Sequence, residues 1–145
     1  MTNELDYDMQ QFILALDNDS NNSIMKLSLD KIKQHKQSIL SDMMLSNSLK
    51  SNLLNKLKNY RYCSEMSDLS EGNYIRWISL KYPDDIKLTR GAYILDVEIL
   101  KDGIFILCRG VIGNIFRIKF DECIIFQKIT NQEFILLNVL KHLDK

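Results

Sequence analysis

The arginines are the residues of this chain with the clearest capacity for chemistry, and all of them lie between Arg61 and Arg117. Arg61 stands between two tyrosines, and Arg76 stands beside Trp77. Guanidinium groups pair with phosphates and carboxylates, and aromatic rings stack on unpaired bases. The same residue types are enriched at the energetic centres of protein interfaces. The grouping therefore predicts a contact surface for single-stranded nucleic acid or for a partner protein, made of Arg61, Tyr74, Arg76, Arg90, Arg109, Arg117 and Lys119.

Ion pairing within the fold is a third interpretation of the same arginines. Acidic residues on neighbouring predicted strands and turns could neutralise them across the sheet. These are Asp96, Glu98, Asp121 and Glu122. The chain carries 19 basic and 19 acidic residues, without the basic excess typical of non-specific nucleic-acid binders. The charge balance therefore favours ion pairing within the fold first, a protein partner second and nucleic acid third.

The other reactive residue types form no pattern typical of catalysis or metal binding. His35 is predicted on an exposed helical face, and His142 lies near the carboxyl terminus. The cysteines are widely spaced without a Cys-x-x-Cys pair, and no P-loop, GxSxG, HExxH or dinucleotide fingerprint occurs. Cys108 and Cys123 are expected to be buried in a strand wall, whereas Cys63 is expected to react faster. We therefore expect no enzyme activity, no metal and no cofactor.

Trp77 stands on an alternating strand, and a single tryptophan in that position is expected in the core. The alternative is an aromatic cage for a cation, which requires several rings to converge. Tyr74, Trp77, Tyr82 and Tyr93 are the candidates for such a cage.

The first 71 residues contain neither glycine nor proline, whereas all 5 glycines and the single proline lie between Gly72 and Gly113. Apolar residues recur at helical spacing over 5–16, 29–44 and 49–60, with Ser28 as the N-cap of the second helix and Lys36 on its outer face. None of these helices is apolar all round, so each needs a partner surface. We predict that Leu49, Leu53 and Leu57 of the third helix contact another chain.

From Gly72 onward the apolar pattern changes to the alternation of strands. Strands are predicted over 74–80, 93–99, 104–109, 116–120 and 123–128, with apolar residues on both faces of the third and fifth. Thr130 and Glu133 form a capping box for a final helix. The sequence predicts an α+β protein: a helical arm of about three helices over 1–66, then a five-stranded SH3- or Tudor-like β-barrel with a C-terminal helix over 72–145. An OB-like barrel is the alternative.

The segments Tyr74–Ile78, Leu88–Gly91, Phe120–Cys123 and Phe126–Lys128 resemble short uncharacterised proteins of nucleocytoplasmic large DNA viruses. The resemblance covers residues 70–143 and contains no catalytic signature. It implies a viral origin and a location in the cytoplasmic viral factory or the virion.

Two functions remain as hypotheses. The first is a non-catalytic adaptor that docks into a larger viral assembly through its helices and barrel, with a protein partner or a second copy. The second is a nucleic-acid-binding barrel that serves viral transcription, packaging or RNA handling. The apolar runs are too short to cross a bilayer, so no membrane association is expected.

Overall fold

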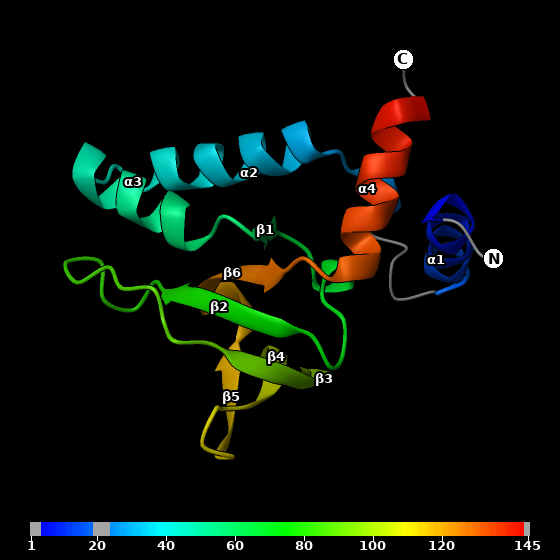
Figure 1. The fold of residues 1–145 in the computed structure, drawn as a ribbon. Coiled ribbons are helices and arrows are strands. Elements are labelled where there is room, and N and C mark those ends of the chain that lie inside the picture. Colours follow the sequence, from blue (N-terminus) through cyan, green and yellow to red (C-terminus); the bar gives the residue numbers. More distant parts are fainter. Residues whose placement is uncertain (1–3, 19–23, 144–145) are drawn as a thin grey trace.

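The computed structural model describes residues 4–18 and 24–143, which form four α-helices and one antiparallel sheet (Figure 1). The helices are α1 (Glu4–Asp17), α2 (Leu29–Asp42), α3 (Asn47–Lys56) and α4 (Asn131–Leu143). The strands are β1 (Tyr60–Cys63), β2 (Tyr74–Ser79), β3 (Ala92–Leu100), β4 (Gly103–Arg109), β5 (Ile115–Lys119) and β6 (Cys123–Lys128). Short 3-10 turns between strands are η2 (Met66–Asp68) and η3 (Phe120–Glu122). The expected α+β class is confirmed.

The sheet has six strands in the order β1-β6-β2-β3-β4-β5 and is not closed into a barrel. In a five-stranded barrel β5 would have to pair with β6. Both edges of β6 are already occupied, one by β2 and the other by β1. The predicted SH3- or Tudor-like barrel is therefore not confirmed, and neither is the OB-like alternative. The difference arises from Tyr60–Cys63, which forms the sixth strand. The sequence places Tyr60 at the end of the third helix and predicts no strand there.

Helices α2 and α3 cover β1, β6 and β2 on one face of the sheet (Figure 1). The N-cap Ser28 is confirmed, since its hydroxyl accepts a hydrogen bond from the Lys31 amide at 3.1 Å. Residues of both helices and of the sheet share one buried cluster, which contains Leu40, Leu53, Leu57, Ile78, Ile124 and Phe126. Leu53 and Leu57 therefore pack inside the molecule, which contradicts their predicted role as contacts to another chain. Leu49 is partly buried against the same cluster.

Lys36 lies in the interface between α2 and α3 rather than on the predicted outer face. Its ammonium group donates hydrogen bonds to the carbonyl oxygens of Leu57 at 2.9 Å and Lys58 at 3.4 Å. Burial, with a smaller effect of the Lys33 charge, lowers the pKa of Lys36. A lysine at this point satisfies carbonyls that the end of a helix leaves unpaired.

Helix α4 begins at the predicted capping box. The Thr130 amide donates to the Glu133 carboxylate at 2.9 Å, and the Glu133 amide donates to the Thr130 hydroxyl at 3.1 Å. Ile129, Leu136 and Leu137 then form a buried cluster with Ala15 of α1 and Ile32 of α2. Among the described residues, no helix combines the length and the apolar character needed to cross a bilayer.

The opposite face of the sheet curves around a second core. Trp77 is buried there as predicted, and its ring lies 5.9 Å from that of Phe116 on β5, three strands away in the sheet. The aromatic cage is not formed, because Trp77 points into this core while Tyr74 and Tyr93 lie together on the other face. The division into units 1–66 and 72–145 stays a prediction. Both β1 and the cluster beneath α2 and α3 join the two parts.

Candidate functional site

The sheet has an inner face that holds the core and an outer face that helices cover only in part. Directly opposite residues of antiparallel strands share a face. By this rule Tyr74 and Arg76 share a face with their partners Tyr93 and Phe126. Helices α2 and α3 lie over β1, β6 and β2 on that face, and none of the described helices lies over β3, β4 or β5 (Figure 1).

The uncovered side chains form three rows across β3, β4 and β5. A bulge between Ile94 and Asp96 leaves Leu95 as an extra residue, so Tyr93 and Asp96 both belong to the outer face. The rows are Tyr93–Arg109–Ile115, Asp96–Leu107–Arg117 and Glu98–Phe105–Lys119. We call these residues the outer patch.

The outer patch mixes apolar and basic side chains. Tyr93 is 41% exposed and Ile115 is 64% exposed, while Phe105 and Leu107 are half-buried between them. Arg109 is also exposed. Aromatic and aliphatic side chains beside arginine are the composition found at the centres of protein interfaces.

Tyr74 extends the outer patch onto β2, where its contacts fix the position of Tyr93. Its ring packs edge-on against Tyr93 with centroids 5.0 Å apart, and its hydroxyl donates to the Arg90 carbonyl at 2.8 Å. Gly91 lies directly beneath the ring with a φ of +106°, and a Cβ there would come within 2.4 Å of the Tyr74 ring. Only glycine fits this backbone, so the sequence itself positions the tyrosine pair.

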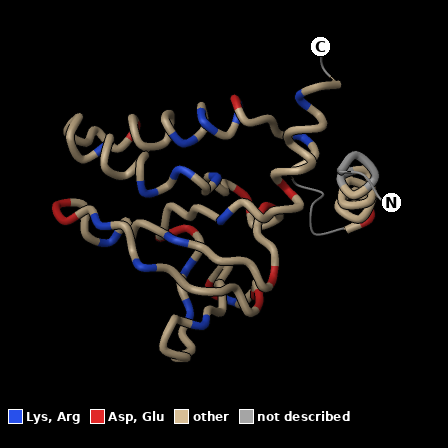
Figure 2. The backbone as a smooth tube through the Cα atoms, in the orientation of Figure 1, with Lys and Arg blue, Asp and Glu red and all other residues tan. Residues whose placement is uncertain are grey.

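Charge on the outer patch is partly neutralised. Arg117 and Glu98 form an ion pair across β4, with Nε donating to the carboxylate at 2.7 Å. This confirms the ion-pair interpretation for Glu98, although the two strands are not adjacent. Glu122 pairs with Lys81 at 3.2 Å instead of with an arginine. Figure 2 shows basic and acidic residues interspersed along the backbone of the sheet and its loops.

The structure brings together four of the residues predicted as contacts and separates the others. Those on the uncovered part of the outer face are Tyr74, Arg109, Arg117 and Lys119. Arg76 is half-buried at the border of the helices, where its Nε donates to the Thr89 carbonyl at 2.9 Å. Arg90 is exposed in the loop beside Tyr74. Arg61 is buried elsewhere, with 1% of its surface exposed.

Sequence reasoning did not include four apolar members of the outer patch among the contact residues: Tyr93, Phe105, Leu107 and Ile115. One feature of the sequence did point to them. The strand predicted over 104–109 has apolar residues on both faces, whereas a strand that borders a single core needs them on only one face. The same signal in 123–128 has a different cause, because α2 and α3 cover the outer face of β6.

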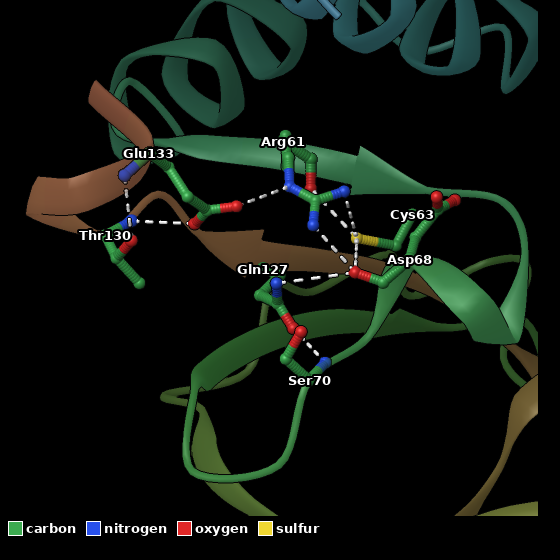
Figure 3. A network of polar contacts seen from close by, with 7 residues as sticks. All are labelled: Arg61, Cys63, Asp68, Ser70, Gln127, Thr130 and Glu133. Atoms are coloured by element: carbon green, nitrogen blue, oxygen red, sulfur yellow. Dashed lines mark hydrogen bonds and ion pairs between the residues drawn. The ribbon is translucent and has the colours of Figure 1, made fainter. Parts of the chain in front are cut away.

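Arg61 is the centre of a buried polar network (Figure 3). Its guanidinium donates to the Asp68 carbonyl at 2.7 Å, and its Nε lies 3.6 Å from the Glu133 carboxylate, which is also 1% exposed. Gln127 joins the network by donating from its side-chain amide to the Asp68 carbonyl at 3.4 Å, and its side-chain oxygen accepts from the Ser70 amide at 2.9 Å. These contacts link β1, the η2 turn, β6 and α4, so we assign Arg61 to the architecture rather than to the contact surface.

A groove of about 600 Å³ lies between α2 and the segment around β1 and η2. Its lining is chemically mixed and includes His35, Asp42, Tyr62, Glu65 and Asp68. Among the described residues, no group of three or more histidine, cysteine, aspartate or glutamate side chains is arranged to hold a metal ion. The groove therefore has enough volume for a ligand, but its lining does not form a recognisable catalytic or metal-binding arrangement.

The three thiols are all protected by burial. Desolvation raises the pKa of Cys63 and of Cys108 to about 12 and that of Cys123 to about 11. Cys63 is 2% exposed and Cys108 is fully buried, whereas Cys123 is partly exposed. The expectation that Cys63 reacts fastest is contradicted, because Cys63 lies inside the network around Arg61.

We expect Cys123 to react first with a thiol reagent in the native protein, followed much later by Cys63 and Cys108. The thiolate is the reactive form, so a higher pKa lowers the reactive fraction at neutral pH. Below these pKa values each unit of added pH should raise the labelling rate about tenfold. Peptide mass spectrometry after timed labelling at two pH values measures the order, with urea-unfolded protein as the control. Faster labelling of Cys63 than of Cys123 would contradict the burial order.

No protein-family model matches this sequence, and comparison with curated proteins and with solved structures finds no significant similarity. A functional assignment therefore depends on the surface itself. The outer patch is the candidate site that combines exposure, apolar area and fixed geometry.

Proposed function

We propose that this protein is a non-catalytic adaptor that binds a partner protein on its outer patch and thereby docks into a larger assembly. The observation that carries the proposal is the unequal cover of one continuous sheet face. Helices cover the apolar side chains of β1, β6 and β2, while no described helix covers those of β3, β4 and β5, which are exposed or half-buried beside arginines. Burying such side chains against a partner removes apolar area from water. The resemblance to proteins of large DNA viruses extends the proposal to a viral assembly in the factory or virion.

The docking surface in this proposal is the outer patch of the sheet, whereas the sequence predicted docking through the third helix. Leu53 and Leu57 have no surface left for a partner, because both are buried where α3 packs against α2 and the sheet. The outer patch instead offers Tyr93, Leu107 and Arg109 within one part of the sheet. The proposal needs no cofactor and no membrane.

Site-specific photo-crosslinking tests the adaptor proposal. We expect a photo-reactive phenylalanine analogue in place of Arg109 to yield one adduct of constant mass in an extract of the native host cells. The same analogue in place of Gln34, which is exposed on α2, is the matched control and should yield no such adduct. Adding Tyr93→Ser to the Arg109 variant should remove the adduct, because the aromatic anchor is lost. Equal adducts from both positions, or an adduct that survives Tyr93→Ser, would overturn the proposal.

Single-stranded nucleic acid is a second candidate for the same surface, and one observation favours it. The paired rings of Tyr74 and Tyr93 lie beside Arg109, which is an arrangement suited to stacking and phosphate contact. Asp96 and Glu98 in the same patch oppose a polyanion, so we rank this candidate second. Binding of a labelled single-stranded oligonucleotide that weakens as salt rises, and is lost in Tyr93→Ser, would favour it over a protein partner.

A further inference from the structure

β5 forms the free edge of the sheet beside the outer patch. Among the described strands, only β4 pairs with β5. The backbone groups on its other side therefore point away from the sheet, where an additional strand can bond to them. Such an edge can accept an extended peptide, whose main-chain hydrogen bonds supply affinity and whose alternate side chains supply specificity.

The two faces of β5 differ in chemistry. Ile115, Arg117 and Lys119 belong to the outer face. Phe116 and Ile118 belong to the inner face and pack against the core cluster around Trp77 and Ile106. A strand added to this edge would therefore place alternate side chains beside cationic groups on one face and beside apolar groups on the other.

We infer that β5 accepts an extended segment of a partner protein in which acidic residues alternate with apolar ones. The inference rests on the proposed adaptor function and deepens it by naming the mode of binding and the chemistry of the partner. Acidic side chains complement Lys119 across the new strand pair and add to the partial neutralisation that Glu98 already provides for Arg117. Apolar side chains extend the row of Phe116 and Ile118.

A hollow at the start of β5 supports the apolar half of this pattern. It has a volume of about 280 Å³ and is lined by Trp77, Thr89, Gly110, Val111, Ile112 and Phe116 among others. Val111 and Ile112 are 67% and 89% exposed at its rim. An apolar side chain of the added strand can bury itself there and cover part of this exposed surface.

Charge argues against a second copy of the chain as the occupant of this edge. Antiparallel self-pairing in the register that uses the whole strand would place Arg117 opposite Arg117 of the other copy. Like charges directly opposite each other destabilise a strand pair. Basic side chains on an edge strand are also a common protection against self-association.

Nucleic acid fits the edge less well than an acidic strand does. A polynucleotide that crossed the outer patch would meet Asp96 and Glu98 of β3 as well as the cations. A strand along β5 borders on the side chains of β5 itself, which are cationic or apolar. Only a polypeptide can also satisfy the backbone groups of the edge in a regular ladder.

A short synthetic peptide in which glutamate alternates with valine is the probe for strand addition. We expect it to bind the full-length protein and to slow amide hydrogen exchange in 115–119. A peptide of the same composition with its glutamates grouped together should bind more weakly, and a peptide N-methylated at alternate residues should not bind. Lys119→Glu should weaken binding about tenfold, because a cross-strand attraction becomes a repulsion. Lys31→Glu on exposed α2 is the matched control and should bind like the wild type.

Three results would overturn the inference. The first is no binding at peptide concentrations up to about 1 mM. The second is binding without slowed exchange in 115–119, and the third is displacement of the peptide by a single-stranded oligonucleotide. If the peptide fails while crosslinking at Arg109 keeps its partner-dependent adduct, strand addition is wrong and the adaptor function stands. If both experiments fail, both proposals are wrong.

Discussion

Leu53→Asp is expected to unfold the whole protein, including the sheet. Leu53 is 3% exposed in the cluster that α2 and α3 share with β2 and β6. Truncating a buried leucine costs about 2–5 kcal/mol, and a charge left unpaired in the core adds several more. The sum is comparable to the total stability of a typical domain, about 5–15 kcal/mol. Circular dichroism and the fluorescence of Trp77, which lies in the other core, measure the loss.

Asn52→Asp is the matched control for this experiment. It introduces the same residue one position earlier on α3, where the side chain is exposed, and should leave stability within about 0.5 kcal/mol of the wild type. Native Trp77 fluorescence in Leu53→Asp would show that the sheet folds without the helical layer. That result would support the division at residues 66–72, whereas loss of the native fluorescence would show that the shared cluster makes the two parts one cooperative unit.

Glu133→Gln is expected to lower the free energy of unfolding by about 3 kcal/mol. Glutamine keeps the acceptor that the capping box needs, so helix initiation is preserved. It removes the carboxylate charge 3.6 Å from the buried Arg61 guanidinium, so the attraction of this ion pair is lost inside the fold. Urea denaturation followed by Trp77 fluorescence measures the change.

Combining Glu133→Gln with Arg61→Met provides the internal control. With both charges gone, no uncompensated ion remains, and the double variant should be more stable than Glu133→Gln alone. Asn131→Ala, on the exposed first turn of the same helix, should change stability little. A loss below about 1 kcal/mol in Glu133→Gln would show that the ion pair contributes little to the fold.

Local features of the fold were predictable because neighbouring residues determine them. Ser28 caps α2, and Thr130 and Glu133 form the capping box of α4, as the sequence predicted. Five of the six strands follow from alternation and turn residues. The burial of Trp77 follows from its place on such a strand.

β1 could not be predicted in the same way. Its residues, Tyr60–Cys63, continue the apolar spacing of the preceding helix and contain no turn signal. They become a strand because β6 offers a free edge, and the pairing of Tyr62 with Phe126 joins positions far apart in the chain. A contact at that sequence separation leaves no local pattern.

The predicted contact residues show the same difference between local sequence and tertiary structure. Composition and alternation predicted that Arg76, Arg109 and Arg117 lie on strands and that Gly91 lies in a connection between strands. Tertiary structure alone decided that Arg61 is buried against Glu133, while Arg109 and Arg117 lie on an open face. It also decided that helices cover β6 and leave β4 exposed. Exposure depends on which surfaces pack together, and packing is a property of the whole chain rather than of any segment.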